Sequence, residues 1–422
     1  MKILLASSAG IYDNRYPETS KNQNGFGIMI RSLADMLAFE GDSVDIITQS
    51  NITKGRDMGK SRLLAKTWWK LICHTKLFYI KKALHFCRQK DLSVGLKLRS
   101  FLYFMTGSYC EYLITKEKYD VVHINGIGES SVAYMYACIR TNTPFVLTLH
   151  GLISFDDTIK TQRFNKRMER EFYKFTKENP KALSTVISTG IKKRLENFLE
   201  TAVDGIHVVC NPIIASSLAN SEPYKKKDNE KIIVCIGNIT KNKNQKLVVD
   251  SFNKLCEKYE GHYKLFVIGK YESDLRKYAE ENNIKNVVFT GGLEKNVVND
   301  YYNIADLCVT GTLNEGFGLP LVEAYSYGVP CVMSRTIDPF PDLGDEMCCV
   351  PAESYDVNIF ADAMYKALTK KWNAEKIIDF SNGFTEKTIS AKYLMVLRRA
   401  AEYKEAPFNI EVIDSIIKAS EK

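Results

Sequence analysis

The sequence lacks the patterns that mark membrane-spanning, secreted or zinc-binding proteins. No apolar run approaches the roughly 18 residues that a transmembrane helix needs. The 11 cysteines form no Cys-x-x-Cys pair and no regular spacing, so they predict neither a disulfide framework nor a zinc site. The apolar run at the start is too short for a secretory signal. We therefore expect a protein of the reducing cytoplasm with no membrane-spanning segment.

What the sequence contains is typical of a globular protein with two domains. Its 422 residues exceed the usual size of one hydrophobic core and fit two domains of roughly 200 residues each. Hydrophobic residues make up 45% of the chain and charged residues 26%, a balance that argues against extensive disorder.

Short apolar runs alternate with helical stretches twice along the chain, and many of the runs end in glycine. Strands that alternate with helices are typical of parallel sheets covered by helices. We therefore expect an α/β protein with two doubly wound, Rossmann-like domains that face each other across a cleft, where ligands bind beyond the carboxyl ends of the strands. The expected strands are 2–7, 44–48, 121–124, 144–150 and 185–188, then 232–237, 265–269, 287–291, 307–311 and 329–334.

The positive charge is concentrated in one segment. Residues 54–118 contain 15 Lys and Arg against four Asp and Glu, a surplus of 11, whereas the whole chain carries +8. We expect a basic amphipathic insertion here, within an N-terminal domain of residues 1–215. A hydrophilic junction then leads to a C-terminal domain of residues 216–385. Helices in 386–422 are expected to pack back on the first domain.

Two glutamates, Glu315 and Glu323, stand seven uncharged residues apart in the segment NEGFGLPLVEAYSYGVPCV. Pro320 favours the first turn of a helix, so we expect a helix that begins there, with Glu323 one turn inside it. Gly316 and Gly318 let the preceding loop approach a ligand, and a helix start favours an anion such as a diphosphate. A carboxylate accepts two hydrogen bonds in a fork, which suits Glu323 to a ribose diol and Glu315 to a sugar hydroxyl. Taken alone, the pair fits equally well with a second interpretation, in which both carboxylates merely stabilise the positive end of the helix.

The surrounding stretch, FTGGLEKNVVNDYYNIADLCVTGTLNEGFGLPLVEAYSYGVPCV, closely resembles the nucleotide-sugar half of family 4 retaining glycosyltransferases, which have the GT-B fold. In that family the first glutamate of the Glu-x7-Glu pair faces the donor sugar and the second faces the ribose. The resemblance is weaker in the first domain and absent from about residues 50–117. It implies these roles for Glu315 and Glu323. It also implies donor binding through the backbone of the loop formed by Gly316, Phe317, Gly318 and Leu319.

A second segment, IGNITKNKNQKLVVDSF, is similar to the family's Gly-Arg-x4-Lys-Gly stretch, whose cations neutralise the diphosphate. Counting from Gly237 places Lys243 at the family lysine. Asn238 stands at the family arginine, so one bidentate phosphate contact is lost, although the position still belongs to the donor site. An exposed lysine in a polar turn is the alternative interpretation of Lys243.

Positions in the first domain match the family as well. His150, in PFVLTLHG, resembles a histidine at the end of a strand that approaches the donor sugar. Gly25 and Gly27 match a glycine-rich turn that closes on the phosphates, and a plain helix start is the alternative.

The resemblance implies transfer with retention at the anomeric carbon, with the acceptor attacking on the face that the nucleotide leaves. A diphosphate oxygen takes the acceptor proton, so the residues assigned to catalysis position and stabilise: Glu315, His150 and Lys243. The chain has no Asp-x-Asp motif, and we expect no metal. We expect no cofactor beyond the co-substrate, a UDP- or GDP-sugar.

Two other classes of function remain open. A nucleotide-sugar 2-epimerase of GT-B fold would bind the same donor without a second substrate, but the Glu-x7-Glu pair argues against it. The other class is not enzymatic: a donor-binding protein that has lost activity, suggested by Asn238, or a nucleic-acid binder, suggested by the basic segment. The intact glutamate pair, Lys243 and His150 argue against lost activity, and nucleic-acid binding would not need the second-domain motifs. We therefore expect no nucleic-acid partner.

The basic insertion mixes aromatic and aliphatic residues with cations, which suits the headgroup region of an anionic membrane. An ordinary pair of helices packed on the first domain is the alternative. Many relatives extend lipid-linked saccharides of bacterial surface polysaccharides such as lipopolysaccharide or capsule. We therefore expect a lipid-linked saccharide acceptor and peripheral binding at the inner face of the plasma membrane. The surface would include Trp68, Trp69, Lys70, Lys76, Lys81 and Lys82.

Overall fold

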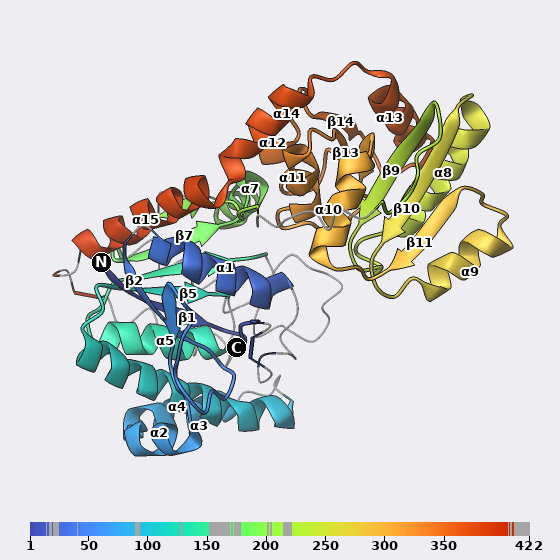
Figure 1. Cartoon of the computed structure of the whole chain (residues 1–422). Coiled ribbons are helices and arrows are strands. Elements are labelled where there is room, and N and C mark those ends of the chain that lie inside the picture. Colours follow the sequence, from blue (N-terminus) through green and yellow to red (C-terminus); the bar gives the residue numbers. More distant parts are fainter. Residues whose placement is uncertain are drawn as a thin grey trace. The chain divides into compact units, whose positions relative to one another are not determined.

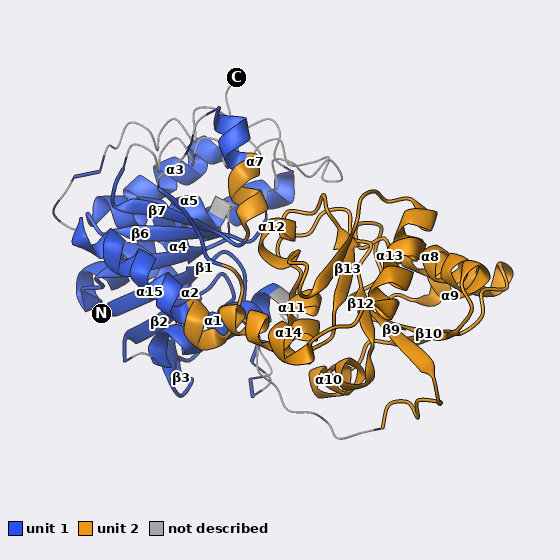
Figure 2. Ribbon diagram, turned by 90° about the horizontal axis from the view of Figure 1, so that it is seen from above, with its two compact units in different colours: residues 1–187, 195–209, 390–422 blue, residues 188–194, 210–389 orange. Residues whose placement is uncertain are grey.

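The structure is a computed structural model in which the chain forms two compact units (Figures 1 and 2). Unit 1 comprises Met1–Ile187, Leu195–Val209 and Ser390–Lys422, and unit 2 comprises Ser188–Arg194 and Cys210–Ile389. The boundary expected at residues 215 and 216, and the end of the chain after residue 408, lie outside the described residues. The described residues are 1–13, 15–16, 19, 25–39, 41–88, 93–126, 129–151, 169, 172, 179–200, 202, 205–213, 222–403, 405 and 407–408.

Unit 1 is built on an eight-stranded sheet in the order β3-β4-β2-β1-β5-β6-β7-β8. Strand β1 lies inside the sheet because its apolar run, from Ile3 to Ala6, is buried on both faces, as is usual for a central parallel strand. Neighbouring strands are parallel except for β3 and β4. The strands are β1 Lys2–Ser7, β2 Ser43–Ile47, β3 Arg56–Asp57, β4 Ser61–Leu63, β5 Val121–Asn125, β6 Phe145–Leu149, β7 Ala182–Val186 and β8 Ile206–Val208.

The helices of unit 1 cover this sheet and carry most of the basic insertion (Figure 1). Helices α2 and α4 begin at the N-caps Thr67 and Ser93, whose hydroxyls accept backbone N–H bonds. Helix α4 packs against α2, α3 and α5. Helices α7 and α15 each contribute residues to both units. The helices are α1 Gly25–Phe39, α2 Trp68–His74, α3 Leu77–Cys87, α4 Val94–Glu117, α5 Glu129–Arg140, α7 Thr189–Leu199 and α15 Glu386–Glu402.

Unit 2 is built on a six-stranded, entirely parallel sheet in the order β11-β10-β9-β12-β13-β14. Its core joins apolar residues of the sheet to those of α8 and α13, which pack against each other. The strands are β9 Glu230–Ile236, β10 His262–Ile268, β11 Val287–Gly291, β12 Leu307–Val309, β13 Cys331–Ser334 and β14 Cys349–Ala352. The helices are α8 Gln245–Lys258, α9 Ser273–Glu281, α10 Lys295–Ile304, α11 Leu319–Ser326, α12 Phe340–Leu343, α13 Val357–Thr369, α14 Ala374–Ser381 and a 3-10 turn Asn382–Phe384.

The prediction of two α/β units with parallel sheets is confirmed, with two local differences. The sheet of unit 1 is mixed, because β3 pairs antiparallel with β4 inside the basic insertion. Helix α11 begins at Leu319 rather than at Pro320, because Gly318 adopts the left-handed conformation (φ 86°) that serves as its N-cap. Among the described residues, no helix has the length and apolar composition needed to cross a bilayer.

Candidate active site

In unit 2, the loop between β12 and α11 presents the first predicted glutamate. The left-handed Gly318 ends the loop, and a Cβ there would lie 3.1 Å from the side chain of Leu321. The Phe317 side chain is buried and its ring lies 5.7 Å from that of Phe384. Between Gly316 and Gly318 the loop therefore offers a ligand its backbone, since the Phe317 side chain packs inside the unit.

Glu315 and Lys243 form an ion pair although they are 72 residues apart in the chain. The Lys243 Nζ lies 2.5 Å from Glu315 Oε2, and the two side chains are 32% and 14% exposed. Lys243 belongs to the turn between β9 and α8, which follows the strand next to β12 in the sheet. The two residues predicted for the diphosphate and for the sugar thus lie together at the carboxyl ends of neighbouring strands.

Asn242 holds these two loops together. Its Nδ2 donates to the carbonyl of Asn314 at 2.9 Å, and its Oδ1 accepts the Asn314 backbone N–H at 3.0 Å. The backbone N–H of Leu313 also donates to the carbonyl of Asn242 at 2.8 Å. Three hydrogen bonds therefore fix the position of the residue directly before Glu315.

Glu323, on α11, is held by two residues of the preceding helix. Its Oε1 lies 2.5 Å from Lys295 Nζ, and its Oε2 accepts a hydrogen bond from the hydroxyl of Tyr302 at 3.1 Å. Tyr302 is completely buried, and burial together with the nearby Glu323 carboxylate raises the pKa of its hydroxyl well above the usual range. The hydroxyl therefore stays a donor, and the carboxylate is oriented before any ligand arrives.

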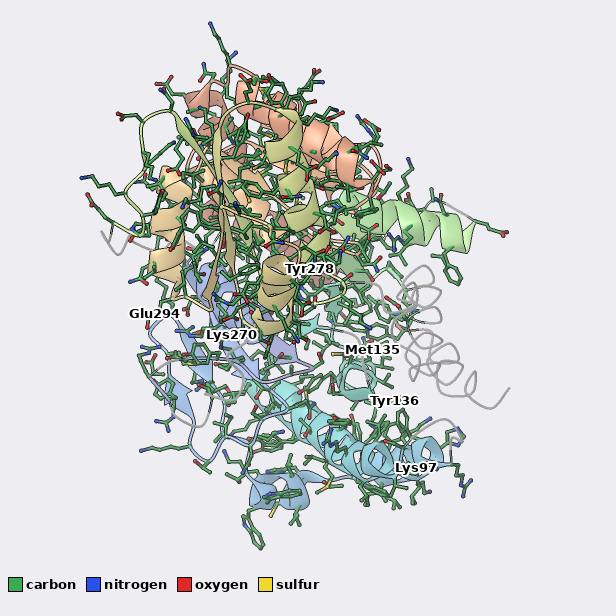
Figure 3. The ribbon with its side chains drawn as sticks, turned by 90° about the vertical axis from the view of Figure 1, so that its right-hand side faces the viewer. Lys97, Met135, Tyr136, Lys270, Tyr278 and Glu294 are labelled. Atoms are coloured by element: carbon green, nitrogen blue, oxygen red, sulfur yellow. The ribbon has the colours of Figure 1, made fainter. Side chains whose placement is uncertain are left out.

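Asn238, at the position of the family arginine, connects two loops of the same sheet edge. Its Oδ1 accepts the backbone N–H of Lys270 at 3.2 Å, whereas its Nδ2 has no partner among the described residues. Figure 3 labels Lys270, which follows β10, and Glu294, which follows β11 and caps α10. Asn244, after Lys243, adopts a left-handed φ of 48°, a conformation that asparagine tolerates better than most residues.

In unit 1, His150 lies at the end of β6 beside the end of β5. Its Nε2 is 3.2 Å from Asn125 Oδ1, and its ring packs edge-on against Phe26 of α1 with ring centroids 5.1 Å apart. Because Asn125 Oδ1 can only accept, Nε2 carries the ring proton, and the shielded Nδ1 is an acceptor without a partner among the described residues. Burial lowers the pKa of His150 to about 3, so the ring is neutral at physiological pH.

A second histidine, His123, is buried in β5 near His150. His123 Nε2 lies 2.7 Å from the hydroxyl of Thr148, which is 2.5 Å from that of Thr185. Burial first, and then the neighbouring His150, lowers the pKa of His123 to about 3. This edge of unit 1 is therefore a neutral polar cluster.

The two predicted glycines lie at the start of α1. Gly25 is the first residue of the helix, and the carbonyl of Gly27 accepts the backbone N–H of Tyr12 at 3.1 Å. Phe26, between them, contacts His150. The residues directly before Gly25 lie outside the described part of the chain.

The predicted membrane surface divides into exposed and internally paired residues. Trp68 and Trp69 are 57% and 74% exposed at the start of α2. Lys76 pairs with the buried Glu111 at 2.6 Å, and Lys82 lies over the rings of Phe78 and Tyr136. Lys70 and Lys81 form no ion pair with any described carboxylate.

The structure thus brings the predicted residues into two clusters, one in each unit. Residues that the sequence did not reveal complete them: Lys295 and Tyr302 orient Glu323, Asn242 fixes the loop of Glu315, and Asn125 orients His150. Lys295 and Tyr302 lie more than 20 residues before Glu323 in the chain, and only the folded arrangement of α10 and α11 brings them to it. Among the described residues no cluster of three metal-ligating side chains is present.

Two family models match adjoining parts of the chain. The model for glycosyl transferases group 1 matches residues 217–382, and the model for Glycosyltransferase Family 4 matches residues 23–216. Together they span both units up to α14.

Curated relatives match at low identity. A lipopolysaccharide 1,6-galactosyltransferase of Salmonella typhimurium is 32% identical over 155 residues, which is 35% of this chain and 41% of that protein. The GPI3 subunit of a phosphatidylinositol N-acetylglucosaminyltransferase of Saccharomyces cerevisiae is 25% identical over 63% of this chain and 59% of that protein. An uncharacterized glycosyltransferase of Methanocaldococcus jannaschii is 24% identical over 52% and 58% of the two chains. The matches therefore span between two fifths and three fifths of these relatives.

Solved structures share the fold over nearly the full length. The lipopolysaccharide outer core galactosyltransferase WaaB superposes with a TM-score of 0.64 and 15% identity, covering 94% of this chain and 99% of that chain. A trehalose-6-phosphate enzyme from E. coli with bound UDP-2-fluoro glucose gives 0.65 with 11% identity, covering 94% and 99%. The GT-B fold prediction is confirmed. By its two family models, the chain belongs to the group 1, family 4 glycosyltransferases.

Proposed function

We propose that the protein is a retaining, metal-independent glycosyltransferase that moves a sugar from a UDP- or GDP-sugar to a hydroxyl of a lipid-linked saccharide in the synthesis of a surface polysaccharide. The observation that carries the proposal is the pairing of Lys243 with Glu315, next to the glycine loop that leads into α11. A cation and a carboxylate fixed 2.5 Å apart suit a ligand with a diphosphate next to a sugar.

Lys243 serves as the cation for the leaving diphosphate. An ammonium group has three donors, so the contact with Glu315 leaves two for phosphate oxygens. Glu315 Oε1 has no partner among the described residues and can accept a sugar hydroxyl. The diphosphate thus binds on the Lys243 side of the ion pair and the sugar binds on the Glu315 side.

Glu323 serves the ribose. Lys295 and Tyr302 each occupy one lone pair of the carboxylate, and each oxygen keeps another for a ribose hydroxyl. The contacts hold the carboxylate in one rotamer, which lowers the entropy lost on binding.

In the transfer itself the bond between the anomeric carbon and the diphosphate oxygen breaks, and a bond to the acceptor oxygen forms on the same face. The acceptor proton passes to the departing diphosphate oxygen, so the reaction balances without a protein base. Lys243 stabilises the charge that develops on the diphosphate. The neutral His150, with Nδ1 as an acceptor, holds a hydroxyl of the donor sugar.

Two observations support a lipid-linked acceptor. The named relatives include enzymes of lipopolysaccharide and of phosphatidylinositol, both of which act on lipid molecules by their printed names. Within unit 1 the basic insertion exposes Trp68 and Trp69 next to cations. Aromatic residues and cations together suit an anionic membrane surface.

The proposal is tested by thermal unfolding with a panel of UDP-, GDP- and ADP-sugars, since a ligand that binds only the folded protein raises its stability. Nucleotide-sugars of one base are expected to raise the midpoint of thermal unfolding. The nucleotide-sugar that raises it is then incubated with acceptors. Release of nucleotide with formation of a glycoside supports the proposal. Conversion of the donor to its 2-epimer without an acceptor would show that the protein is an epimerase instead.

Membrane binding is tested by co-sedimentation with vesicles containing phosphatidylglycerol. Each cation near an anionic surface adds roughly 1 kcal/mol, so Lys70→Ser with Lys81→Ser should weaken binding about 30-fold at low salt. High salt should weaken binding of the wild type as well. The control is Lys254→Ser with Lys277→Ser, two exposed lysines of unit 2. An equal loss in the control would show that binding is not through the basic insertion.

A further inference from the structure

Helices α2, α3 and α4 line a half-open cavity of about 320 Å³ within unit 1. The only hydroxyl groups in its lining belong to Thr75 and Tyr79, and the Thr75 hydroxyl donates to the carbonyl of Leu71 at 2.6 Å. The remaining lining is apolar and comes from all three helices: Ile72, Ile80, Ala83, Phe101 and Met105.

Exposed apolar side chains lead along two helices into this cavity. On α3, Leu77 and Leu84 are 64% and 48% exposed and flank the lining residue Ile80, which is 37% exposed. Their spacing of three and four residues places them on one face of the helix. On α4, Val94 and Leu98 are 75% and 70% exposed, and the same spacing continues to the lining residues. A contiguous exposed apolar surface of this kind marks an interaction site.

The chemistry of the lining selects the occupant. A peptide segment would bring backbone N–H and C=O groups, and this cavity offers almost no partners for them. A hydrocarbon chain has no such groups. A second copy of this chain would bring the same surplus of positive charge to the surface, which disfavours self-association.

Charge near the cavity indicates the head group. Lys97 lies four residues before the lining residue Phe101, on the same face of α4, and forms no ion pair with any described carboxylate. Figure 3 labels this lysine, while Tyr136 marks α5, against which α4 packs. A cation next to an apolar opening complements a lipid with an anionic head group.

We propose that this cavity binds the hydrocarbon chain of the anionic lipid-linked acceptor, with Lys97 next to its phosphate. The inference rests on the proposed function for the identity of the lipid. It goes beyond that function by assigning a chain-binding site in the insertion, distinct from general adsorption to a membrane surface.

Alkyl phosphates below their micelle concentration test the site without a membrane. The chain has three tryptophans, Trp68, Trp69 and Trp372, so Trp372→Phe leaves only the two reporters of α2. A bromine in the alkyl chain is expected to quench them saturably, at one molecule per protein. Each added methylene should tighten binding about fourfold until the cavity is filled. Lack of quenching by monomeric alkyl phosphates, with binding to vesicles preserved, would overturn the proposal.

A matched pair of substitutions separates the cavity from the surface. Ile80→Ser, in the lining, should weaken alkyl phosphate binding at least tenfold, whereas Leu84→Ser, one turn away and more exposed, should change it less than about twofold. Ile72→Ser, at a lining residue that is 57% exposed, repeats the test at a position that does not support the core. Equal losses from Ile80→Ser and Leu84→Ser would show adsorption to the apolar surface and overturn the proposal.

Failure of the chain-binding site can be distinguished from failure of the proposed function. Donor binding is measured by the nucleotide-dependent shift in thermal unfolding, which Ile80→Ser should leave unchanged. If transfer occurs equally well to acceptors with and without an alkyl chain, and chain binding is absent, the cavity assignment is wrong while the glycosyltransferase stands. If chains bind as expected but no nucleotide-sugar shifts the unfolding midpoint, the chain-binding site stands and the proposed function is wrong.

Discussion

The two units place opposite kinds of chemistry at the carboxyl ends of their strands. Unit 2 fixes two ion pairs there, Lys243 with Glu315 and Lys295 with Glu323, both at 2.5 Å. Unit 1 instead has two neutral histidines, His150 after the end of β6 and His123 in the middle of β5, whose pKa values burial lowers to about 3. The same α/β architecture thus supports one charged cluster and one uncharged cluster.

Under the proposed function, the two clusters suit different chemical groups of a nucleotide-sugar. A nucleoside diphosphate carries its negative charge at one end, and a fixed cation stabilises that charge best when it is already in place. A sugar ring carries only hydroxyl groups, and an uncharged imidazole acceptor avoids the cost of burying an unpaired charge. The comparison therefore predicts that Glu323 and Lys243 of unit 2 act on nucleotide binding and leaving-group departure, whereas Glu315 of unit 2 and His150 of unit 1 act on the sugar.

The largest effect is expected for Lys243→Met. The substitution removes the cation from the diphosphate and leaves Glu315 as an unpaired carboxylate beside the leaving group. Loss of one such electrostatic contact typically costs about 100–1,000-fold in turnover. Turnover is measured with saturating acceptor.

The control for Lys243→Met is Lys258→Met, which removes a lysine from an exposed ion pair with Asp362 on the same unit. If Lys243→Met kept its activity within a few-fold of the wild type, the contrast between the charged and the neutral cluster would be wrong, because unit 2 would then not depend on its charge.

The next effect is expected for Glu323→Ala. The change removes the carboxylate assigned to the ribose and leaves Lys295 without its partner, whereas the Tyr302 hydroxyl still donates to the Pro320 carbonyl at 3.0 Å. An unmade hydrogen bond to a charged group costs about 1.5–3 kcal/mol, so nucleotide affinity should fall about 10- to 150-fold. Calorimetric titration with the nucleotide alone measures it.

Two variants sharpen this prediction. Glu315→Gln should slow transfer while leaving nucleotide affinity nearly constant, because Glu315 is assigned to the sugar. Glu353→Ala removes a carboxylate from the exposed pair with Arg335 and should change neither quantity. Equal nucleotide affinity in the wild type and Glu323→Ala would rule out the ribose assignment.

A smaller effect, on pH dependence, is expected in unit 1. The folded pKa of His123 lies below its ordinary value near 6.5, so the unfolded chain binds the proton more tightly. Stability from this residue is complete above about pH 6.5 and falls as the pH drops toward about 3, by up to about 1.4 kcal/mol per pH unit. In proton NMR, two of the six histidine ring signals should stay constant between pH 5 and 8. Titration of all six in that range would contradict a neutral cluster in unit 1.

The two regions also differ in what their sequence revealed. The residues Glu315, Glu323 and Lys243 were predicted because their spacing and flanking glycines form compact motifs. The partners Lys295 and Tyr302 were not, because they lie at the start and near the end of an ordinary amphipathic helix, α10, and contact Glu323 only in the folded unit. Asn125 was missed for the same reason, since it meets His150 only where β5 and β6 lie side by side.

In the fold, likewise, elements set by the local sequence were predicted, and elements set by tertiary contacts were missed. Buried parallel strands such as β1 and β10 were predicted because a central strand is apolar on both faces. Strands β3 and β4, of two and three residues, were missed because their sequence is polar and their pairing depends on the neighbouring β2. The start of α11 was placed one residue late because the left-handed Gly318 caps the helix before Pro320.

The smallest effect is expected from metal removal, which tests whether protein cations alone serve the diphosphate in unit 2. The sequence has no Asp-x-Asp motif, and Lys243 already holds a cation next to the Glu315 carboxylate. A divalent metal and a fixed lysine are alternative ways to stabilise a departing diphosphate. Excess EDTA should therefore change the transfer rate by less than about twofold, a change too small to assign to a lost Lewis acid. A magnesium-dependent kinase in the same buffer confirms that the chelator is effective. If transfer stops and magnesium or manganese restores it, the charged cluster of unit 2 is incomplete without a metal. The contrast with unit 1 would then depend on that ion as well as on the protein cations.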